Sequence, residues 1–165
     1  KYDLMIAHPP CTYLSVSGNR WLYNKDGSRN KERWQNRGKA LAFVNLLMNA
    51  PIKHIVIENP ISVISSQIRK PDQIIQPFMF GDKASKSTCL WLKNLDKIKP
   101  TNIVDKGEFF EWVDKKGKTK KQPLWYYNAF LNSKTDAERR TLRSKTFPGM
   151  AKAIANQINN QINNL

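Results

Sequence analysis

Cysteine and histidine are scarce in the 165-residue chain, which contains two of each. The two cysteines, Cys11 and Cys89, are too few for a disulfide framework or a four-cysteine zinc site. The two histidines give no metal-ligand spacing with them, so we expect no metal site. Few cysteines without paired spacing are typical of a reducing compartment, and the predicted location is the cytoplasm.

Long apolar runs are also missing. No run approaches the roughly 18–20 residues that a bilayer-spanning helix needs, and the short apolar run after Asp3 does not have the form of a signal peptide. Hydrophobic residues nevertheless make up 40% of the chain and aromatic residues 10%. This content is enough for one buried core and argues against disorder of the whole chain. The length fits one domain.

Acidic residues are the third shortage. The chain has 13 Asp and Glu against 28 Lys and Arg, so its formal net charge is +15. Such a charge on a small chain favours a polyanionic partner, and nucleic acid is the commonest one. The alternative is a basic protein that has no such partner.

The first third of the sequence predicts a strand–helix–strand unit. An apolar strand over residues 2–7 ends before a pair of prolines, and a long loop rich in Ser, Gly and Asn follows. Asn30 is a suitable cap for a helix over residues 31–49, and a second strand covers residues 54–57. The apolar stripe of that helix has helical spacing and consists of Trp34, Leu41, Val44, Leu47 and Met48. The two strands should be parallel, with a right-handed crossover.

The remaining sequence predicts two more strands, an insertion and a final helix. The strands cover residues 73–80 and 88–92. Residues 97–134 break the pattern, and their basic run over 115–121, flanked by aromatic residues, is typical of a hairpin. The final helix starts near Gly149 and carries its apolar residues on one face: Ile154, Ile158, Ile162 and Leu165.

Two chemically capable side chains stand at the ends of the predicted parallel strands. Cys11 follows the first strand, and Glu58 follows the second. Ligands of open α/β sheets bind outside the carboxyl ends of the strands, where a thiolate can act as a nucleophile and a carboxyl group can transfer a proton. Each residue also has a structural interpretation, Cys11 as a small core side chain and Glu58 as a hydrogen-bonding loop residue. A further alternative makes His8 a general base for Cys11, as in a Cys–His hydrolase.

Two segments resemble the catalytic motifs of the DNA cytosine-5 methyltransferases. Asp3–Gly18, which contains His-Pro-Pro-Cys-Thr-Tyr-Leu, is similar to that family's apolar strand, its Pro-Cys pair and the Ser- and Gly-containing loop that follows. Ile55–Pro60 is similar to the strand that ends in Glu-Asn-Val, with Pro60 in place of the valine. The likeness is greatest to phage-encoded cytosine methyltransferase-like proteins.

Two further segments resemble later elements of the same family. The pair Phe80-Gly81, followed by Lys86 and a strand, is similar to a third element that contains an aromatic-glycine pair and a cation. Ser144–Ile158 resembles the last motif, a turn before a helix rich in Ala and Ile. The family places its target-recognition segment between these two elements, which is the position of the 97–134 insertion.

The resemblance implies a fold and a mechanism. The fold would be a Rossmann-like class I methyltransferase sheet, mostly parallel with an antiparallel edge hairpin. The Cys11 thiolate would attack C6 of a cytosine flipped out of DNA, Glu58 would assist at N3, and S-adenosylmethionine would supply the methyl group. The implied location is the cytoplasm of a bacterial or phage-infected host cell. Substrate- or DNA-binding roles are implied for Pro10, Ser15, Arg20, Asn59, Lys86, Lys116, Lys118, Lys120, Lys121 and Trp125.

One part of the family's pattern has no counterpart in the chain. The family's cofactor-binding strand, with its Phe-x-Gly-x-Gly loop and its acidic ribose-binding residue, is missing. We therefore expect residues 1–165 to be a single domain that is a fragment, whose cofactor site is completed by about 50 upstream residues or by a partner chain. Within it, residues 1–96 and 135–165 would form the methyltransferase-like core, and 97–134 would be the insertion.

Two other functions stay open. An exocyclic-amine DNA methyltransferase has a Pro-Pro-aromatic loop at the same strand end, whereas this chain has Cys11 after its prolines and Tyr13 two positions later. A non-catalytic DNA-binding protein on a methyltransferase-like scaffold would explain both the charge and the missing cofactor strand. The position of the methyl group on the product distinguishes the first alternative, and a Cys11 substitution without consequence would identify the second.

Overall fold

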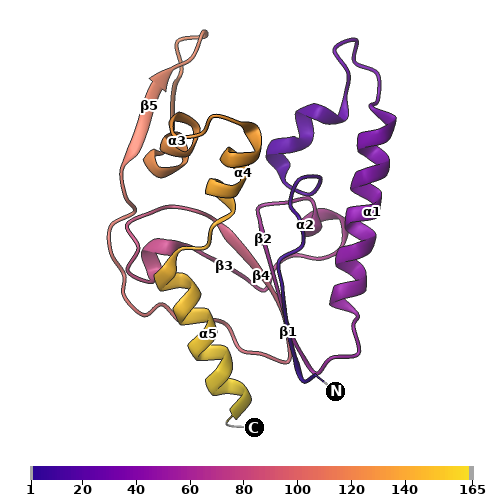
Figure 1. The fold of residues 1–165 in the computed structure, drawn as a ribbon, viewed down its shortest axis with the longest axis vertical. Helices are drawn as coiled ribbons and strands as arrows, with labels where there is room; N and C mark the ends of the chain where they lie inside the picture. Colours follow the sequence, from indigo (N-terminus) through magenta and orange to yellow (C-terminus); the bar gives the residue numbers. More distant parts are fainter. Residues whose placement is uncertain (1, 164–165) are drawn as a thin grey trace. The chain divides into compact units, whose positions relative to one another are not determined.

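The computed structural model describes residues 2–163 (Figure 1). These residues belong to two compact units, where the sequence predicts a single domain. The first unit contains residues up to Ile75 together with Ser87–Lys97, and the second contains Gln76–Lys86 and the residues from Ile98 onward. Residues 135–163 therefore group with the predicted insertion and not with the core in which the sequence analysis places them.

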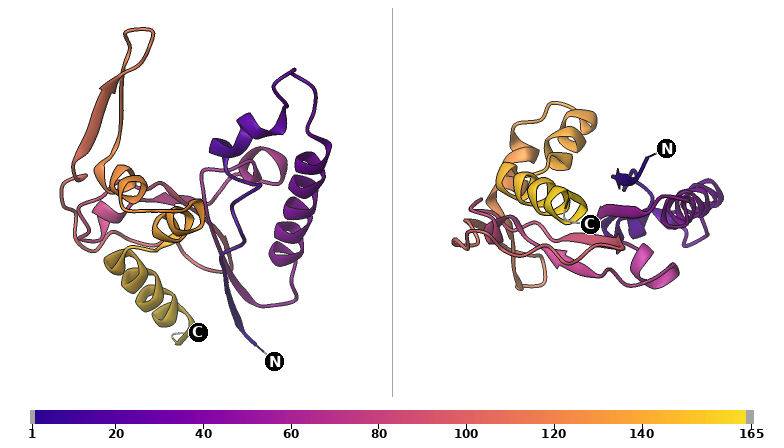
Figure 2. Two further views of the ribbon diagram at one scale, coloured as in Figure 1. Left: turned by 45° about the horizontal axis from the view of Figure 1, so that its top comes forward. Right: turned by 90° about the horizontal axis from the view of Figure 1, so that it is seen from below.

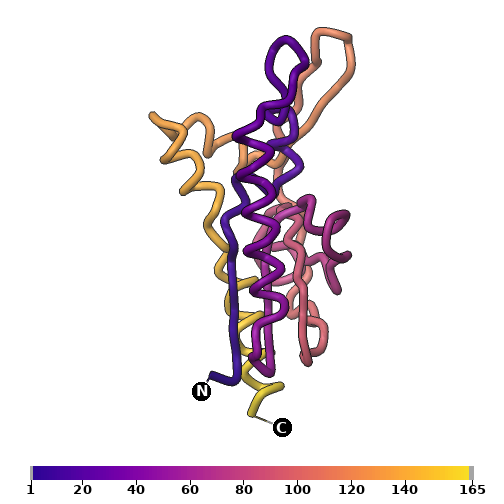
Figure 3. Tube along the Cα trace, turned by 90° about the vertical axis from the view of Figure 1, so that its right-hand side faces the viewer, coloured from indigo at the N-terminus to yellow at the C-terminus, as the bar shows by residue number. Residues whose placement is uncertain are grey.

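A four-stranded sheet with the order β1-β2-β4-β3 forms the centre of the first unit. Its strands are β1 (Leu4–Ala7), β2 (His54–Pro60), β3 (Gln73–Ile75) and β4 (Thr88–Lys93). Its helical elements are η1 (Val16–Leu22), α1 (Lys31–Met48) and α2 (Ile64–Gln67). β1 and β2 are parallel, and α1 connects them and runs alongside them (Figure 3). The predicted strand–helix–strand unit is confirmed.

The prediction of a mostly parallel sheet is wrong, because β4 runs antiparallel to both of its neighbours, β2 and β3. A parallel return needs a crossover of a dozen or more residues, usually a helix packed on the sheet. In the first unit the chain between β2 and β4 contains only the four-residue α2 as a helix, which is too short for that purpose. The predicted antiparallel edge pair corresponds to β3 and β4, with β3 at the edge. The first unit is a mixed α/β fold.

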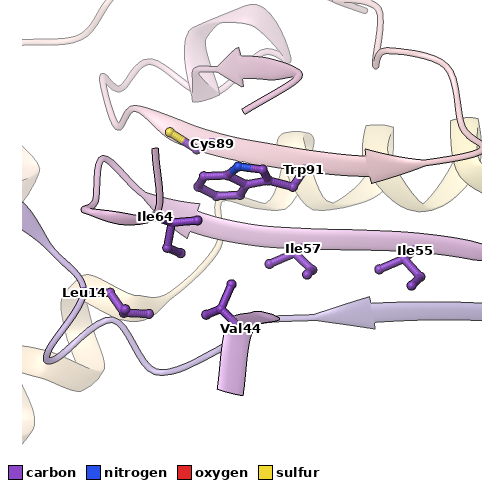
Figure 4. Close-up of a cluster of buried hydrophobic side chains, with 7 residues drawn as sticks. All are labelled: Leu14, Val44, Ile55, Ile57, Ile64, Cys89 and Trp91. Carbon is purple, nitrogen blue, oxygen red and sulfur yellow. The ribbon is translucent and has the colours of Figure 1, made fainter. Parts of the chain in front are cut away.

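Side chains from β2, β4, α1 and the adjoining loops form the core of the first unit (Figure 4). The buried cluster comprises Leu14, Val44, Ile55, Ile57, Ile64, Cys89 and Trp91. The Trp91 indole donates a hydrogen bond to the Arg69 carbonyl at 2.9 Å, so its polar atom is satisfied. Burial and the nearby Glu58 carboxylate raise the pKa of the Cys89 thiol to about 11. Cys89 is therefore a protonated core side chain at neutral pH.

Helix α1 begins where the sequence predicts. The Asn30 side chain accepts a hydrogen bond from the Arg33 N–H at 3.1 Å, which caps the helix. The predicted apolar stripe is confirmed at Val44, which is buried, but is wrong at Trp34, which is exposed. The buried residue of the early turns is instead Arg37. The early turns of α1 contact the polar loop after β1, whereas the later turns contribute to the apolar core, so one apolar stripe does not run the whole length.

The second unit consists of a hairpin, helices and connecting segments. Its elements are η2 (Pro77–Met79), β5 (Phe109–Val113), β6 (Thr119–Pro123), α3 (Leu124–Leu131), α4 (Asp136–Ser144) and α5 (Pro148–Asn163). β5 and β6 form the predicted antiparallel hairpin, which extends beyond α3 (Figure 2). Its turn contains Gly117 at a φ of 73°, a conformation that favours glycine.

The edge strand β3 is shorter than predicted, and the final helix forms where it is predicted. The strand predicted over residues 73–80 ends at Ile75, because Pro77 lacks an N–H group and begins η2. The predicted final helix is confirmed as α5 and buries Ile158, while the predicted apolar position Leu165 lies outside the described residues. None of the helices formed by residues 2–163 is both long enough and apolar enough to cross a membrane.

Two substitutions in α1 test the assignment of its buried face. Val44→Ala should lower the free energy of unfolding by about 2 kcal/mol, because Val44 is buried in the core and the change leaves a cavity. Leu46→Ala, two positions away on an exposed face, should change it by less than about 0.5 kcal/mol. Urea unfolding followed by circular dichroism measures both values, and equal losses would contradict the assignment.

Candidate active site at the ends of two parallel strands

The register of β1 and β2 places His8 beside Glu58. Ala7 pairs with Ile57, so the residues that follow them, one after each strand, lie at the same level of the sheet. Nδ1 of His8 lies 2.9 Å from Oε2 of Glu58, and the two side chains are 56% and 19% exposed. This hydrogen bond raises the pKa of His8 above its ordinary value of 6.5, against the opposing effect of burial. The pair is not among the sequence-based predictions, although the matched positions after two parallel strands are a signal for it.

The loop that carries Cys11 is attached to the strand that carries Glu58. Nδ2 of the buried Asn59 donates a hydrogen bond to the Pro9 carbonyl at 2.8 Å. Pro10 and Cys11 follow directly and are exposed. Asn59 therefore acts as a structural tie, where the resemblance implies contact with substrate. The structure brings the Cys11 loop and Glu58 to one edge of the sheet, as predicted.

The two loops that follow these residues also pair with each other. The Val63 N–H donates to the Leu14 carbonyl at 2.9 Å, and Ser15 forms a β-bridge with Ser62. The Ser15 side chain accepts a hydrogen bond from the Ser17 N–H at 3.3 Å and thereby caps η1. Ser15 thus fixes the shape of the loop after Cys11.

Two arginines of α1 hold the same loop from the other side. Arg37, which is buried, donates from Nε to the Tyr13 carbonyl at 2.9 Å and from Nη2 to Oδ1 of Asn19 at 2.7 Å. Arg33 donates to the Thr12 carbonyl at 3.4 Å. Burial lowers the pKa of Arg37, and the charge of Arg33 lowers it further. Sequence reasoning misses both residues; their spacing of one helical turn on a helix that follows a polar loop is the available signal.

Arg20 is another residue of the first unit for which a DNA-binding role is implied. It is exposed in η1, and its guanidinium lies 4.6 Å from the ring centroid of Trp21. The side chain is therefore available at the surface, as a contact with a phosphate or a base requires.

The predicted DNA-binding lysines of the second unit lie on the β5–β6 hairpin. Lys116, Lys118, Lys120 and Lys121 are all exposed. Oδ1 of Asp114 accepts hydrogen bonds from the Lys116 and Lys118 N–H groups at 2.9 and 3.0 Å, which shapes the turn. The base of the hairpin is held by aromatic contacts, since the Phe110 and Tyr127 rings stack with centroids 3.8 Å apart. A stable hairpin thus presents a row of cations to solvent.

Lys86 and Trp125 have structural contacts within the second unit. Nζ of Lys86 donates to the carbonyls of Arg143 and Lys145 at 3.0 and 2.9 Å, near the end of α4. The Trp125 indole donates to the Ser85 carbonyl at 3.0 Å, and its ring packs edge-on against Phe147. These contacts use the ammonium group of Lys86 and the indole N–H of Trp125 within the fold, whereas the resemblance implies that both side chains contact DNA.

A hollow in the first unit lacks the groups that S-adenosylmethionine would need. This hollow, of about 370 Å³, lies beside the Ile55–Lys93 pair, at the end of β2 that is remote from Glu58. Its polar side chains, Arg69, Lys93 and Asn94, include no carboxylate that could hold ribose hydroxyls. Among residues 2–163, no group of three or more His, Cys, Asp or Glu side chains could hold a metal ion.

No family model, no curated protein and no solved structure matches the chain.

The His8–Glu58 pair makes a testable prediction about pH. Glu58→Gln should lower the pKa of His8, because the amide removes the anionic acceptor. The folded-state pKa of His8 lies above 6.5, so the pair stabilises the fold below about pH 6.5 and this contribution is lost as the pH rises through that pKa. NMR titration of the imidazole measures the shift, with Glu32→Gln on α1 as the control. An unchanged His8 titration in Glu58→Gln would show that the pair does not form.

Proposed function

We propose that the first unit is the catalytic region of a DNA cytosine-5 methyltransferase-like enzyme. The observation that carries the proposal is the hydrogen bond from Asn59 to the Pro9 carbonyl. It ties an exposed cysteine, delivered by one strand, to a carboxylate delivered by the parallel neighbour. In this proposal the β1–α1–β2 crossover is the preserved part of a Rossmann-like methyltransferase sheet.

The proposed chemistry uses Cys11 as the nucleophile. Its thiolate forms a bond to C6 of a cytosine that has left the base stack, and the electrons of the C5–C6 double bond make C5 nucleophilic. The carboxyl group of Glu58 would hydrogen-bond N3 and the exocyclic amine, which stabilises the negative charge that develops on the ring. The neighbouring His8, whose pKa is raised by its hydrogen bond to Glu58, is the member of the pair that holds a proton more readily and can relay it through Glu58 toward N3.

The methyl donor in this scheme is S-adenosylmethionine, which supplies an electrophilic methyl group to C5. Because the family's cofactor-binding strand has no counterpart in the chain, an upstream segment or a partner chain would complete the site for this cofactor in this proposal. The steps that belong to this chain are the attack at C6, the stabilisation at N3 and, after the C5 proton is lost, the departure of the Cys11 thiolate from C6.

The DNA partner in this proposal is contacted by the hairpin of the second unit. Its four lysines are exposed and can neutralise phosphates, although Lys120 also lies 3.8 Å from the Asp114 carboxylate. The exposed Trp112 on β5 adds a ring that can pack on an unpaired base.

A non-catalytic DNA-binding protein is the second candidate. Two observations favour it: the carboxylate of Glu58 is already engaged by His8, and the hollow beside Ile55 and Lys93 has no carboxylate that could hold a cofactor's ribose. In that case the motifs would serve only to hold the loop, and the basic surfaces would carry the function.

An exchange reaction separates these candidates without the cofactor. Addition of Cys11 at C6 lets C5 take a proton from water, and loss of the original C5 hydrogen with elimination of the thiol restores cytosine. DNA that contains 5-tritiated cytosine should therefore release tritium. Cys11→Ser should abolish the release and Glu58→Gln should slow it about a hundredfold, whereas Cys89→Ala should stay within about threefold of wild type because Cys89 is a core residue.

The outcomes of this experiment differ for each candidate. Release by Cys11→Ser at the wild-type rate would contradict the proposed mechanism. No release by the wild-type chain, together with salt-sensitive DNA binding, would support the non-catalytic candidate.

The hairpin lysines provide a test of the DNA contact. Changing Lys116, Lys118, Lys120 and Lys121 to Gln should weaken binding to a duplex and reduce the slope of log K against log salt by up to about 3.6, at roughly 0.9 for each lost phosphate contact. Lys99→Gln with Lys152→Gln, also in the second unit, is the control and should leave most of the slope. Fluorescence anisotropy at several salt concentrations measures it, and an unchanged slope in the hairpin variant would place the DNA elsewhere.

A further inference from the structure

A cluster of exposed aromatic rings and arginines lies where η1 meets the start of α1. It consists of Arg20, Trp21, Tyr23, Arg29 and Trp34 and is named here the aromatic–arginine surface. Trp21 is 53% exposed, Tyr23 49% and Trp34 37%, all within one short stretch of the first unit. Large aromatic side chains gathered at a surface mark an interaction site more often than chance exposure does.

The five side chains form two contacting groups, Arg20 with Trp21 and Tyr23 with Arg29 and Trp34. The Tyr23 and Trp34 rings meet edge to face with centroids 6.3 Å apart. The guanidinium of Arg29 lies 5.3 Å from the Trp34 centroid, and that of Arg20 lies 4.6 Å from the Trp21 centroid. Tyr23 and Arg29 also form a β-bridge through their backbones. The surface therefore presents flat rings with cations beside them.

The backbone beneath this surface is well tied. The Asn30 N–H donates to the Leu22 carbonyl at 2.9 Å, and the Asn24 N–H donates to the Ser28 carbonyl at 2.8 Å, which closes the loop between η1 and α1. The Asp26 carboxylate accepts hydrogen bonds from the N–H and hydroxyl of Ser28. Rings held in this way lose little freedom when a ligand stacks on them.

The local charge selects the kind of partner. Residues 12–39 contain seven Lys or Arg, of which Arg33 and Arg37 hold the loop after Cys11, and two Asp or Glu, of which Asp26 is used by the turn. Cations favour a phosphate backbone, and exposed rings favour the faces of bases. Bases inside a duplex have their faces covered by their neighbours, so only an unpaired strand can use both features.

We propose that the aromatic–arginine surface binds single-stranded nucleic acid by base stacking, with the arginines contacting phosphates. This surface is distinct from the lysine hairpin, which belongs to the second unit. The proposal does not rest on the chemistry proposed for Cys11 and Glu58, which are not part of the surface; Arg20 is the one member that also has an implied DNA-binding role.

The test measures binding of the full chain to fluorescein-labelled oligothymidylate, to oligouridylate and to a blunt duplex of equal length. The double variant Trp21→Ala with Tyr23→Ala should bind at least one of the two single strands about tenfold more weakly, while its affinity for the duplex stays within about twofold. Trp21→Phe with Tyr23→Phe keeps both rings and should restore binding to within about threefold of wild type. The arm that shows the loss identifies DNA, RNA or both as the ligand.

Two controls separate stacking from loss of structure and from catalysis. Phe43→Ala removes another exposed ring of α1, nine residues and about 13 Å along the helix from Trp34, and should bind as wild type does. Cys11→Ser should also bind as wild type, whatever the result of the exchange experiment. The proposal is overturned if wild type binds neither single strand, if the double alanine variant binds both as wild type does, or if it loses duplex affinity equally.

Discussion

The parallel pairing of β1 with β2 is the constraint on which the rest of the first unit depends. The register that aligns Ala7 with Ile57 puts His8 beside Glu58, and the next residues bring Asn59 to the Pro9 carbonyl. Parallel strands require a crossover, and the crossover here is α1. The same helix then supplies the arginines that hold the loop after Cys11. Loss of this pairing would separate every residue of the candidate site.

Features that depend on neighbouring residues could be predicted from the sequence, and features that depend on distant contacts could not. The Asn30 cap, the hairpin around residues 115–121 and the strand–helix–strand order all follow from local signals. The direction of β4 follows from the lack of a long helix between it and β2 in the first unit, which no local pattern states. Helical spacing likewise groups residues on a face but does not say what the face contacts. This is why an apolar stripe beginning at Trp34 was predicted, whereas Arg37 is the buried residue of those turns.

In the candidate site, too, local features could be predicted from the sequence and long-range contacts could not. Strand ends are predictable, so Cys11 and Glu58 could be assigned to one sheet edge before any side chain was placed. The partner of a side chain depends on register to within one residue, and the His8–Glu58 pair was missed for that reason. Lys86 and Trp125 illustrate the opposite case, because a basic or aromatic residue in a motif does not reveal whether it faces solvent. Both are engaged with carbonyl groups inside the second unit.

The charge of Glu58 affects any thiol at this edge of the sheet. Its carboxylate contributes to the raised pKa of Cys89, because a negative charge opposes the formation of a thiolate nearby. A protonated His8 offsets that charge at a distance of 2.9 Å, so the pair together carries no net charge. In the proposed mechanism, the neutral pair would oppose a thiolate on the exposed Cys11 loop less than an isolated carboxylate would. The histidine that precedes the two prolines would then let the carboxyl group and the proposed nucleophile share one sheet edge.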